Sequence, residues 1–244
     1  MLEWHNPNPD SYIAMAYRTR VDLILQTISK YCKRGLILDL GCAQGNLSLL
    51  LAEQGYEVIA VDLRHEYLTY MMLKYERGKL APITASLDSL PFSQKTFDVI
   101  LFGEVIEHVA HPDRVLASLR LLLKDDGHLL ITTPNGGFIR SNLPTASQIE
   151  DWNELEYKQY QPDADGHLFL FTKDELECLL KKEGFQVVTH IFYNTFCMTG
   201  NAGFRHLGRW FPRRWQYKAD QIMLHSRYNS RLAQGQLVAA TPIR

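Results

Sequence analysis

Two carboxylates and one imidazole stand close together in the segment GEVIEHV, residues 103–109. Glu104, Glu107 and His108 follow an apolar run at residues 99–102 that is typical of a buried strand. On a helix, positions i, i+3 and i+4 fall within about 100° of arc, so the three side chains would converge. Such groups bind divalent metals and also act as general acids and bases. The spacing predicts a metal site, an acid/base site with His108 as the base, or only a helix that begins with acids.

A second histidine is a candidate to join this cluster. His167 stands in DGHLFLFTKDELECLL, directly after a segment rich in Asn, Pro, Gly and Asp and before a capped helical pattern. We expect that segment to bring His167 over the edge of the sheet where Glu107 lies.

The elements that must position these residues alternate along the chain. Short apolar runs at residues 36–40, 57–62, 97–102, 128–133, 186–192 and 236–240 predict strands, and helical patterns cover residues 11–32, 46–54, 66–75, 112–123 and 172–183. This alternation indicates an α/β fold with a doubly wound, mostly parallel sheet. Ligands in such folds bind at the carboxyl ends of the strands.

A glycine turn follows the first predicted strand in ILDLGCAQGNLSLLL. Gly41 and Gly45 permit a tight turn and a close approach of ligand to backbone, and the helix that follows offers free N–H groups. The dinucleotide pattern GxGxxG is replaced by GxAxG, and Asp39 before it favours a cationic ligand. Asp62 ends the second predicted strand, where a carboxylate can accept both hydroxyls of a ribose.

At these residues the chain resembles the class I S-adenosylmethionine (SAM)-dependent methyltransferases. LDLGCAQGN is similar to the first motif of that family, and the segment from SLPF to ITTPN is similar to its fourth-strand block and the helix and strand after it. The resemblance extends over about residues 35–192. It implies a Rossmann-like methyltransferase fold that uses SAM.

The resemblance also implies a cofactor site. Asp39, Gly41 and Gly45 would surround the methionine part of SAM, and Asp62 would bind the ribose. Many relatives have an adenine-binding Asp where this chain has Ser86, so the adenine contact rests on Leu87. The whole predicted set is Asp39, Gly41, Ala43, Gly45, Asp62, Leu63, Ser86, Leu87, Gly103 and Glu104.

The ExxEH pattern with a later histidine resembles the metal site of the small-RNA 2′-O-methyltransferases, and ExxEH also occurs in the ubiquinone-pathway O-methyltransferases. By this resemblance Glu104, Glu107, His108 and His167 would hold a divalent ion such as Mg, Mn or Zn. Without an ion, His108 and Glu107 are the predicted catalytic residues. A hydroxyl acceptor needs such activation near neutral pH, because it is a poor nucleophile.

Two segments interrupt the alternation. We divide the chain into an N-terminal helical cap, residues 1–34, and a methyltransferase domain, residues 35–244, with insertions at 135–166 and 195–227. Basic and aromatic residues mix in the second insertion and suggest contact with RNA, peripheral contact with a membrane through 204–217, a lid, or an ordinary packed helical hairpin.

Composition limits the remaining choices. The net charge of −1 gives no global attraction to nucleic acid, and four scattered cysteines without a CxxC pair fit a reducing cytoplasm. The sequence contains no uninterrupted run of about 18 apolar residues, so it predicts no membrane-spanning helix. We expect a cytoplasmic SAM-dependent O-methyltransferase of a small-molecule or lipid-like acceptor. An RNA ribose 2′-O-methyltransferase and a non-catalytic SAM-binding protein are the alternatives, and the oligomeric state is left open.

Overall fold

A seven-stranded sheet forms the centre of the molecule. The computed structural model describes residues 11–159, 166–200 and 212–243. The strand order is β3-β2-β1-β4-β5-β7-β6, with β1 to β5 parallel and β7 antiparallel to both of its neighbours. The strands are β1 Leu36–Leu40, β2 Glu57–Asp62, β3 Lys79–Thr84, β4 Phe97–Gly103, β5 Leu123–Pro134, β6 Phe185–Thr195 and β7 Ala233–Pro242. The predicted doubly wound, mostly parallel sheet is confirmed.

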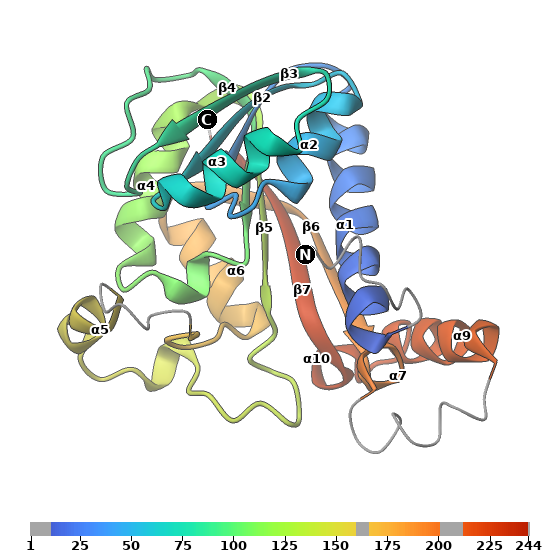
Figure 1. The fold of residues 1–244 in the computed structure, drawn as a ribbon. Coiled ribbons are helices and arrows are strands. Elements are labelled where there is room, and N and C mark those ends of the chain that lie inside the picture. Colours follow the sequence, from blue (N-terminus) through green and yellow to red (C-terminus); the bar gives the residue numbers. More distant parts are fainter. Residues whose placement is uncertain (1–10, 160–165, 201–211, 244) are drawn as a thin grey trace.

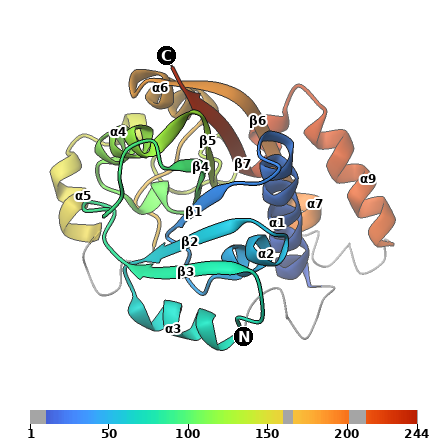
Figure 2. The ribbon, with the colours of Figure 1, turned by 90° about the horizontal axis from the view of Figure 1, so that it is seen from above.

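Helices cover both faces of this sheet. In Figures 1 and 2, α1 (Tyr12–Tyr31) and α2 (Asn46–Glu53) lie on one face, and α4 (Pro112–Leu122) and α6 (Lys173–Lys182) lie on the other. Alternate residues of β1 point to opposite faces: Ile37 packs in a buried cluster with Ile24 and Ile28 of α1, whereas Leu38 packs with Leu116 of α4. Helix α1 therefore shares a buried core with β1 through Ile24 and Ile28.

Local sequence explains where the main helices begin. Ser11 caps α1, because its hydroxyl accepts from the backbone N–H of Ala14 at 3.1 Å. Thr172 and Glu175 form a capping box at the start of α6. Pro112 occupies the first turn of α4, where a missing N–H costs nothing.

One strand was absent from the sequence prediction. β3 has the sequence KLAPIT and pairs only with β2, at the edge of the sheet. Pro82 within it cannot donate to a ladder, and four of its six residues are exposed, so the strand carries no continuous apolar run. An edge position tolerates both features.

The helices of the two insertions lie at the same end of the molecule, drawn at the bottom of Figure 1, with α5 on one side and α9 on the other. The first contains a short 3₁₀ turn, Ala146–Gln148, and α5 (Trp152–Gln159). The second contains α7 (Phe196–Thr199) and α9 (Arg213–Leu224), and α10 (Asn229–Leu232) follows. Helix α3 (His65–Leu73) packs beside β2 and β3.

Candidate active site

A cavity of about 370 Å³ opens at the carboxyl ends of β1, β2 and β4. Among the predicted cofactor residues, it is lined by Gly41, Ala43, Asp62, Leu63, Ser86, Leu87 and Glu104. The sequence prediction missed Arg64, Tyr67, Val105 and Gln159, which also line it. Residues scattered over more than a hundred positions therefore meet at one edge of the sheet, as the topology of parallel strands requires.

The glycine turn that forms one wall of this cavity has a left-handed backbone. Gly41, Ala43 and Gly45 have φ of +72°, +46° and +71°. A Cβ on Gly41 would lie 2.5 Å from Cγ2 of Val105, and one on Gly45 would lie 2.0 Å from Sδ of Met71. Gly45 thus faces α3 and not the cavity, so its bare backbone serves helix packing.

Asp62 is held in place by two backbone donors. Its Oδ2 accepts from the N–H of Ala43 at 2.8 Å, and its Oδ1 accepts from the N–H of Arg64 at 2.9 Å. Each carboxylate oxygen can accept a further hydrogen bond. The carboxylate therefore presents fixed acceptors to the cavity, which is the arrangement that two ribose hydroxyls need.

Asp39 and Gly103 lie behind the cavity lining. Asp39 is buried and accepts a hydrogen bond from the hydroxyl of Ser48. Burial raises the pKa of Asp39 to about 6, the charge of Asp62 also raises it, and the bond from Ser48 opposes the shift. Neither Asp39 nor Ser48 lines the cavity, so any effect of Asp39 on a ligand there would act through its charge.

Leu63, Ser86 and Leu87, which the sequence predicts to contact the cofactor, all line this cavity. Leu63 is 64% exposed, so its side chain is available for an apolar contact. Ser86 is engaged by Asp88, whose Oδ2 lies 3.2 Å from the Ser86 hydroxyl. Asp88 itself does not line the cavity.

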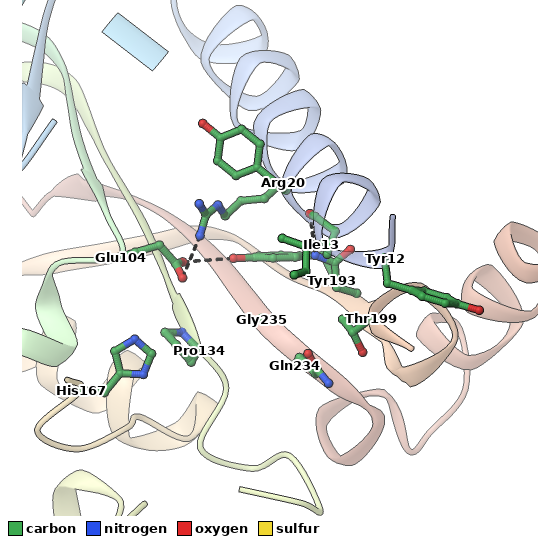
Figure 3. Close-up of a pocket in the computed structure, with 13 residues that line it drawn as sticks. Tyr12, Ile13, Arg20, Glu104, Pro134, His167, Tyr193, Thr199, Gln234 and Gly235 are labelled. Carbon is green, nitrogen blue, oxygen red and sulfur yellow. Dashed lines mark hydrogen bonds and ion pairs between the residues drawn. The ribbon is translucent and has the colours of Figure 1, made fainter. Parts of the chain in front are cut away.

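A second cavity of about 490 Å³ adjoins the first. Glu104 lines both cavities. Figure 3 shows the second cavity between α1, the end of β4 and the ends of β6 and β7. Its wall combines aromatic, apolar and amide side chains: Tyr12, Ile13, Ala16, Tyr17, Arg20, Glu104, Pro134, His167, Tyr193, Asn194, Thr199, Gln234 and Gly235. None of the residues from α1 was singled out from the sequence for this role.

Glu104 does not lie on a regular helix with Glu107 and His108, and that part of the prediction is wrong. Glu104 has φ of +56°, and the turn that follows is a 3₁₀ helix, Ile106–His108. The Glu104 carboxylate turns toward α1 and β6, where it accepts from Nη1 of Arg20 at 2.9 Å and from the hydroxyl of Tyr193 at 3.3 Å (Figure 3). A positive φ at a non-glycine residue costs about 1–3 kcal/mol and is typical of functional sites.

The other three members of the predicted cluster do come together. One ligand atom each from Glu107, His108 and His167 lies within 4.8 Å of the others. The backbone aligns the two segments, because Leu168 N–H donates to the carbonyl of Glu107 at 2.9 Å and Nδ1 of His108 lies 3.1 Å from the carbonyl of Gly166. The two imidazole rings meet edge to face with centroids 5.0 Å apart.

Glu107 is the buried member of this cluster. Its Oε2 accepts from the hydroxyl of Thr133 at 3.0 Å, and its Oε1 lies 3.8 Å from Nε2 of His167. Within the described parts of the chain, Oε1 has no hydrogen-bond partner. Burial and the charge of Glu104 raise the pKa of Glu107 well above its ordinary value.

The comparisons with known proteins agree with this geometry. A family model described as a methyltransferase domain matches residues 14–190. The chain belongs to the class I SAM-dependent methyltransferases. This is a family of methyltransferases, and it implies SAM as the methyl donor.

Curated relatives cover only part of the chain. A ubiquinone biosynthesis O-methyltransferase of Cereibacter sphaeroides is 33% identical over an alignment of 146 residues that covers 54% of this chain and 59% of the relative. A SAM-dependent methyltransferase of Mycobacterium tuberculosis is 28% identical over 127 residues, 52% of this chain and 46% of the relative. The chain therefore matches about half the length of these curated relatives.

Solved structures support the fold over nearly the whole chain. A protein from Pyrococcus horikoshii gives a TM-score of 0.59 at 20% identity and covers 98% of this chain and 97% of its own. A SAM-dependent methyltransferase from Mesorhizobium loti gives 0.60 at 18% identity and covers 90% and 96%. At these identities the likeness is one of fold.

The second insertion is described only in part. Residues 204–211 of the predicted membrane-contact segment 204–217 lie outside the described residues, whereas Arg213, Arg214, Trp215 and Tyr217 lie on α9. Across the described chain, no helix combines the length and apolar character that a bilayer crossing requires.

Proposed function

We propose that this methyltransferase transfers the methyl group of SAM to a hydroxyl of a small aromatic molecule, such as a catechol or another neighbouring diol. One observation carries the proposal. His108 lines the cofactor cavity, His167 lines the adjoining cavity, and the two rings meet at 5.0 Å beside buried Glu107. A group that handles protons thus stands at the junction of the two cavities.

The adjoining cavity suits a phenolic acceptor in size and lining. Tyr12, Tyr17 and Tyr193 offer aromatic surface, and Asn194 and Gln234 offer amide groups. A volume of about 490 Å³ lies in the ordinary range for small-molecule sites. The printed name of the Cereibacter relative, an O-methyltransferase, supports oxygen as the attacked atom.

The chain's residues have distinct roles in this reaction. The bound donor would supply an electrophilic methyl group on a positively charged sulfur. Asp62 would hold the ribose, and the aromatic wall would orient the acceptor for an in-line approach. The imidazole pair of His108 and His167 would accept the hydroxyl proton, and Glu107, whose Oε1 lies 3.8 Å from Nε2 of His167, would hold that ring in place.

A divalent ion is an alternative source of activation at this cluster. The donor set of one carboxylate and two imidazoles suits Mn²⁺, Fe²⁺ or Zn²⁺, and Oε1 of Glu107 is a buried acceptor that no described residue satisfies. The residues therefore fit an ion held by Glu107, His108 and His167. Such an ion would polarise the acceptor oxygen. Glu104, the fourth predicted ligand, is paired with Arg20 and would need to turn to take part.

The test is an acceptor screen by mass shift with SAM, on protein as purified and after exhaustive chelation. The panel contains catechols, monophenols, amines and a short RNA. Methylated catechol, with turnover lowered about 10²–10⁴-fold in Glu107→Gln and His167→Ala, is the expected result. Retained turnover after chelation would assign the proton to the imidazole pair, whereas loss restored by one added metal would assign the ion.

Other results would overturn the proposal. If an amine or the RNA is methylated and the catechols are not, the acceptor is of that class and not an aromatic hydroxyl. SAM binding with no transfer to any panel member would favour a non-catalytic SAM-binding protein. Unchanged turnover in both variants would remove the cluster from the mechanism.

A further inference from the structure

The outward side of α9 combines exposed apolar and basic residues. Arg214, Trp215, Lys218 and Ile222 fall within about 100° of helical arc, and we call these four residues the α9 face. Trp215 is 51% exposed and Ile222 is 72% exposed. Both basic side chains are also exposed, with Nζ of Lys218 lying 5.1 Å and Cζ of Arg214 lying 5.9 Å from the centre of the Trp215 ring.

The inward side of α9 fixes the direction in which this face points. Gln216 and Asp220 are each only 2% exposed. The Oδ1 of Asp220 accepts from the backbone N–H and the hydroxyl of Thr195, at 2.8 and 2.7 Å. Asp220 is the only acid in the sequence of α9, so every charged residue on the outward side is cationic.

These observations point to one kind of partner. We propose that the α9 face docks on a membrane surface that carries anionic phospholipids. Trp215 and Ile222 would enter the boundary between headgroups and acyl chains, and Arg214 and Lys218 would contact phosphates. RNA fits less well, because phosphate contacts and stacking would leave the exposed Ile222 without a partner surface. If α9 only packed against the protein and faced water on its outward side, neither Trp215 nor Ile222 would be needed on that side.

The position of α9 gives such docking a use. Figure 1 shows α9 beside α7 and the first turns of α1. The guanidinium of Arg213 lies over the ring of Tyr12, 4.8 Å from its centre, and both Tyr12 and Thr199 of α7 line the second cavity. Docking would therefore hold that cavity near the membrane, where an apolar aromatic acceptor would be concentrated. This consequence rests on the proposed function, whereas docking itself does not.

The experiment measures binding of the full chain to vesicles without SAM or acceptor. Vesicles of phosphatidylcholine alone are compared with vesicles that contain about one-third phosphatidylglycerol. We expect binding to the anionic vesicles only. The variant Arg214→Gln/Lys218→Gln should lose about 30-fold in affinity, since it removes two cations near an anionic surface. Trp215→Ser/Ile222→Ser should lose about 10-fold or more.

A matched control is available on α5. Tyr157 is 74% exposed and Lys158 is exposed beside it, so Tyr157→Ser/Lys158→Gln removes one aromatic and one cation from another surface. This control should bind as the parent does. Ile222→Ser alone, at the most exposed position of the face, tests the apolar contribution without disturbing the inward packing.

Three outcomes would overturn the proposal. The first is equal binding of the parent protein to both vesicle types. The second is a loss of affinity in the α5 control that equals the loss in the α9 variants. The third is binding of the protein to RNA but not to anionic vesicles. Because no methyl transfer is measured, these outcomes leave the proposed function untouched.

Discussion

The guanidinium of Arg20 and the carboxylate of Glu104 form an ion pair, with Nη1 and Oε2 2.9 Å apart (Figure 3). The pair joins α1 to the end of β4 at the boundary between the two cavities. Its side chains are 24% and 27% exposed, so solvent screens it only in part. It holds the wall that α1 gives to the second cavity.

Loss of this pair should affect the acceptor more than SAM. Arg20 lines only the second cavity, so in Arg20→Met we expect kcat/KM for the acceptor to fall about 10-fold while SAM affinity changes by less than about threefold. A double-mutant cycle with Glu104→Gln should give a coupling of about 1 kcal/mol in unfolding free energy. Titration calorimetry and steady-state kinetics measure these values. Arg18→Met on the same helix is the control, and an equal loss there would contradict the assignment.

Asp62 should dominate the binding of the donor's ribose. In Asp62→Asn one oxygen still accepts a backbone N–H, but one of the two acceptors facing the ribose is lost. We expect the Kd for SAM to rise about 10–100-fold, the effect of losing hydrogen bonds to a charged group. Asp88→Asn changes a neighbouring carboxylate outside the cavity lining and should leave the Kd nearly unchanged. Similar losses in both variants would show that general charge, and not the position of Asp62, governs affinity.

The sequence predicted most of the sheet, and seven of the ten residues predicted for the donor line the first cavity, because both features depend on local patterns. Apolar runs marked six of the seven strands, and the glycine turn with Asp62 marked the cavity. β3 was missed because Pro82 and an exposed edge position remove the periodic signal.

The acceptor side had no comparable signal. Arg20 and Tyr193 are 173 positions apart, and both meet Glu104 only through tertiary packing. The residues of α1 that line the cavity are mostly apolar or aromatic: Tyr12, Ile13, Ala16, Tyr17 and Arg20. In the sequence this pattern is the same as that of an ordinary core-facing helix. Spacing alone also placed Glu104 on a helix, because a positive φ at a glutamate has no signature in the sequence.

Gly45 should matter for stability before it matters for the donor. Gly45→Ala adds left-handed strain and a clash with Met71, so we expect a loss of about 2–4 kcal/mol in unfolding free energy. Gly55→Ala is the control: φ there is +93° and a Cβ would meet nothing within 4 Å, so only strain of about 1–2 kcal/mol remains. Urea denaturation measures both. The Gly45→Ala loss should shrink in a Met71→Ala background. Equal costs at both glycines, with a selective loss of SAM affinity for Gly45→Ala, would instead place Gly45 against the ligand.

Asp39 should make stability depend on pH in a defined direction. Burial raises the folded pKa to about 6 from the ordinary value of 3.8, so the folded state holds an extra proton between these values. The contribution of this proton to the free energy of unfolding is therefore fully present below pH 3.8. It is lost as pH rises through 6, by about 3 kcal/mol in total. Asp39→Asn keeps the shape and an acceptor for Ser48 but removes the titration. Its unfolding free energy is measured in urea from pH 4 to 8. The difference between the variant and the parent should shift in favour of the variant as pH rises toward 6 and should stay constant above that pH.

SAM affinity should fall in Asp39→Asn, because a negative charge behind the cavity favours a cationic donor. A constant difference across this pH range would contradict the raised pKa, and unchanged SAM affinity would remove Asp39 from donor binding.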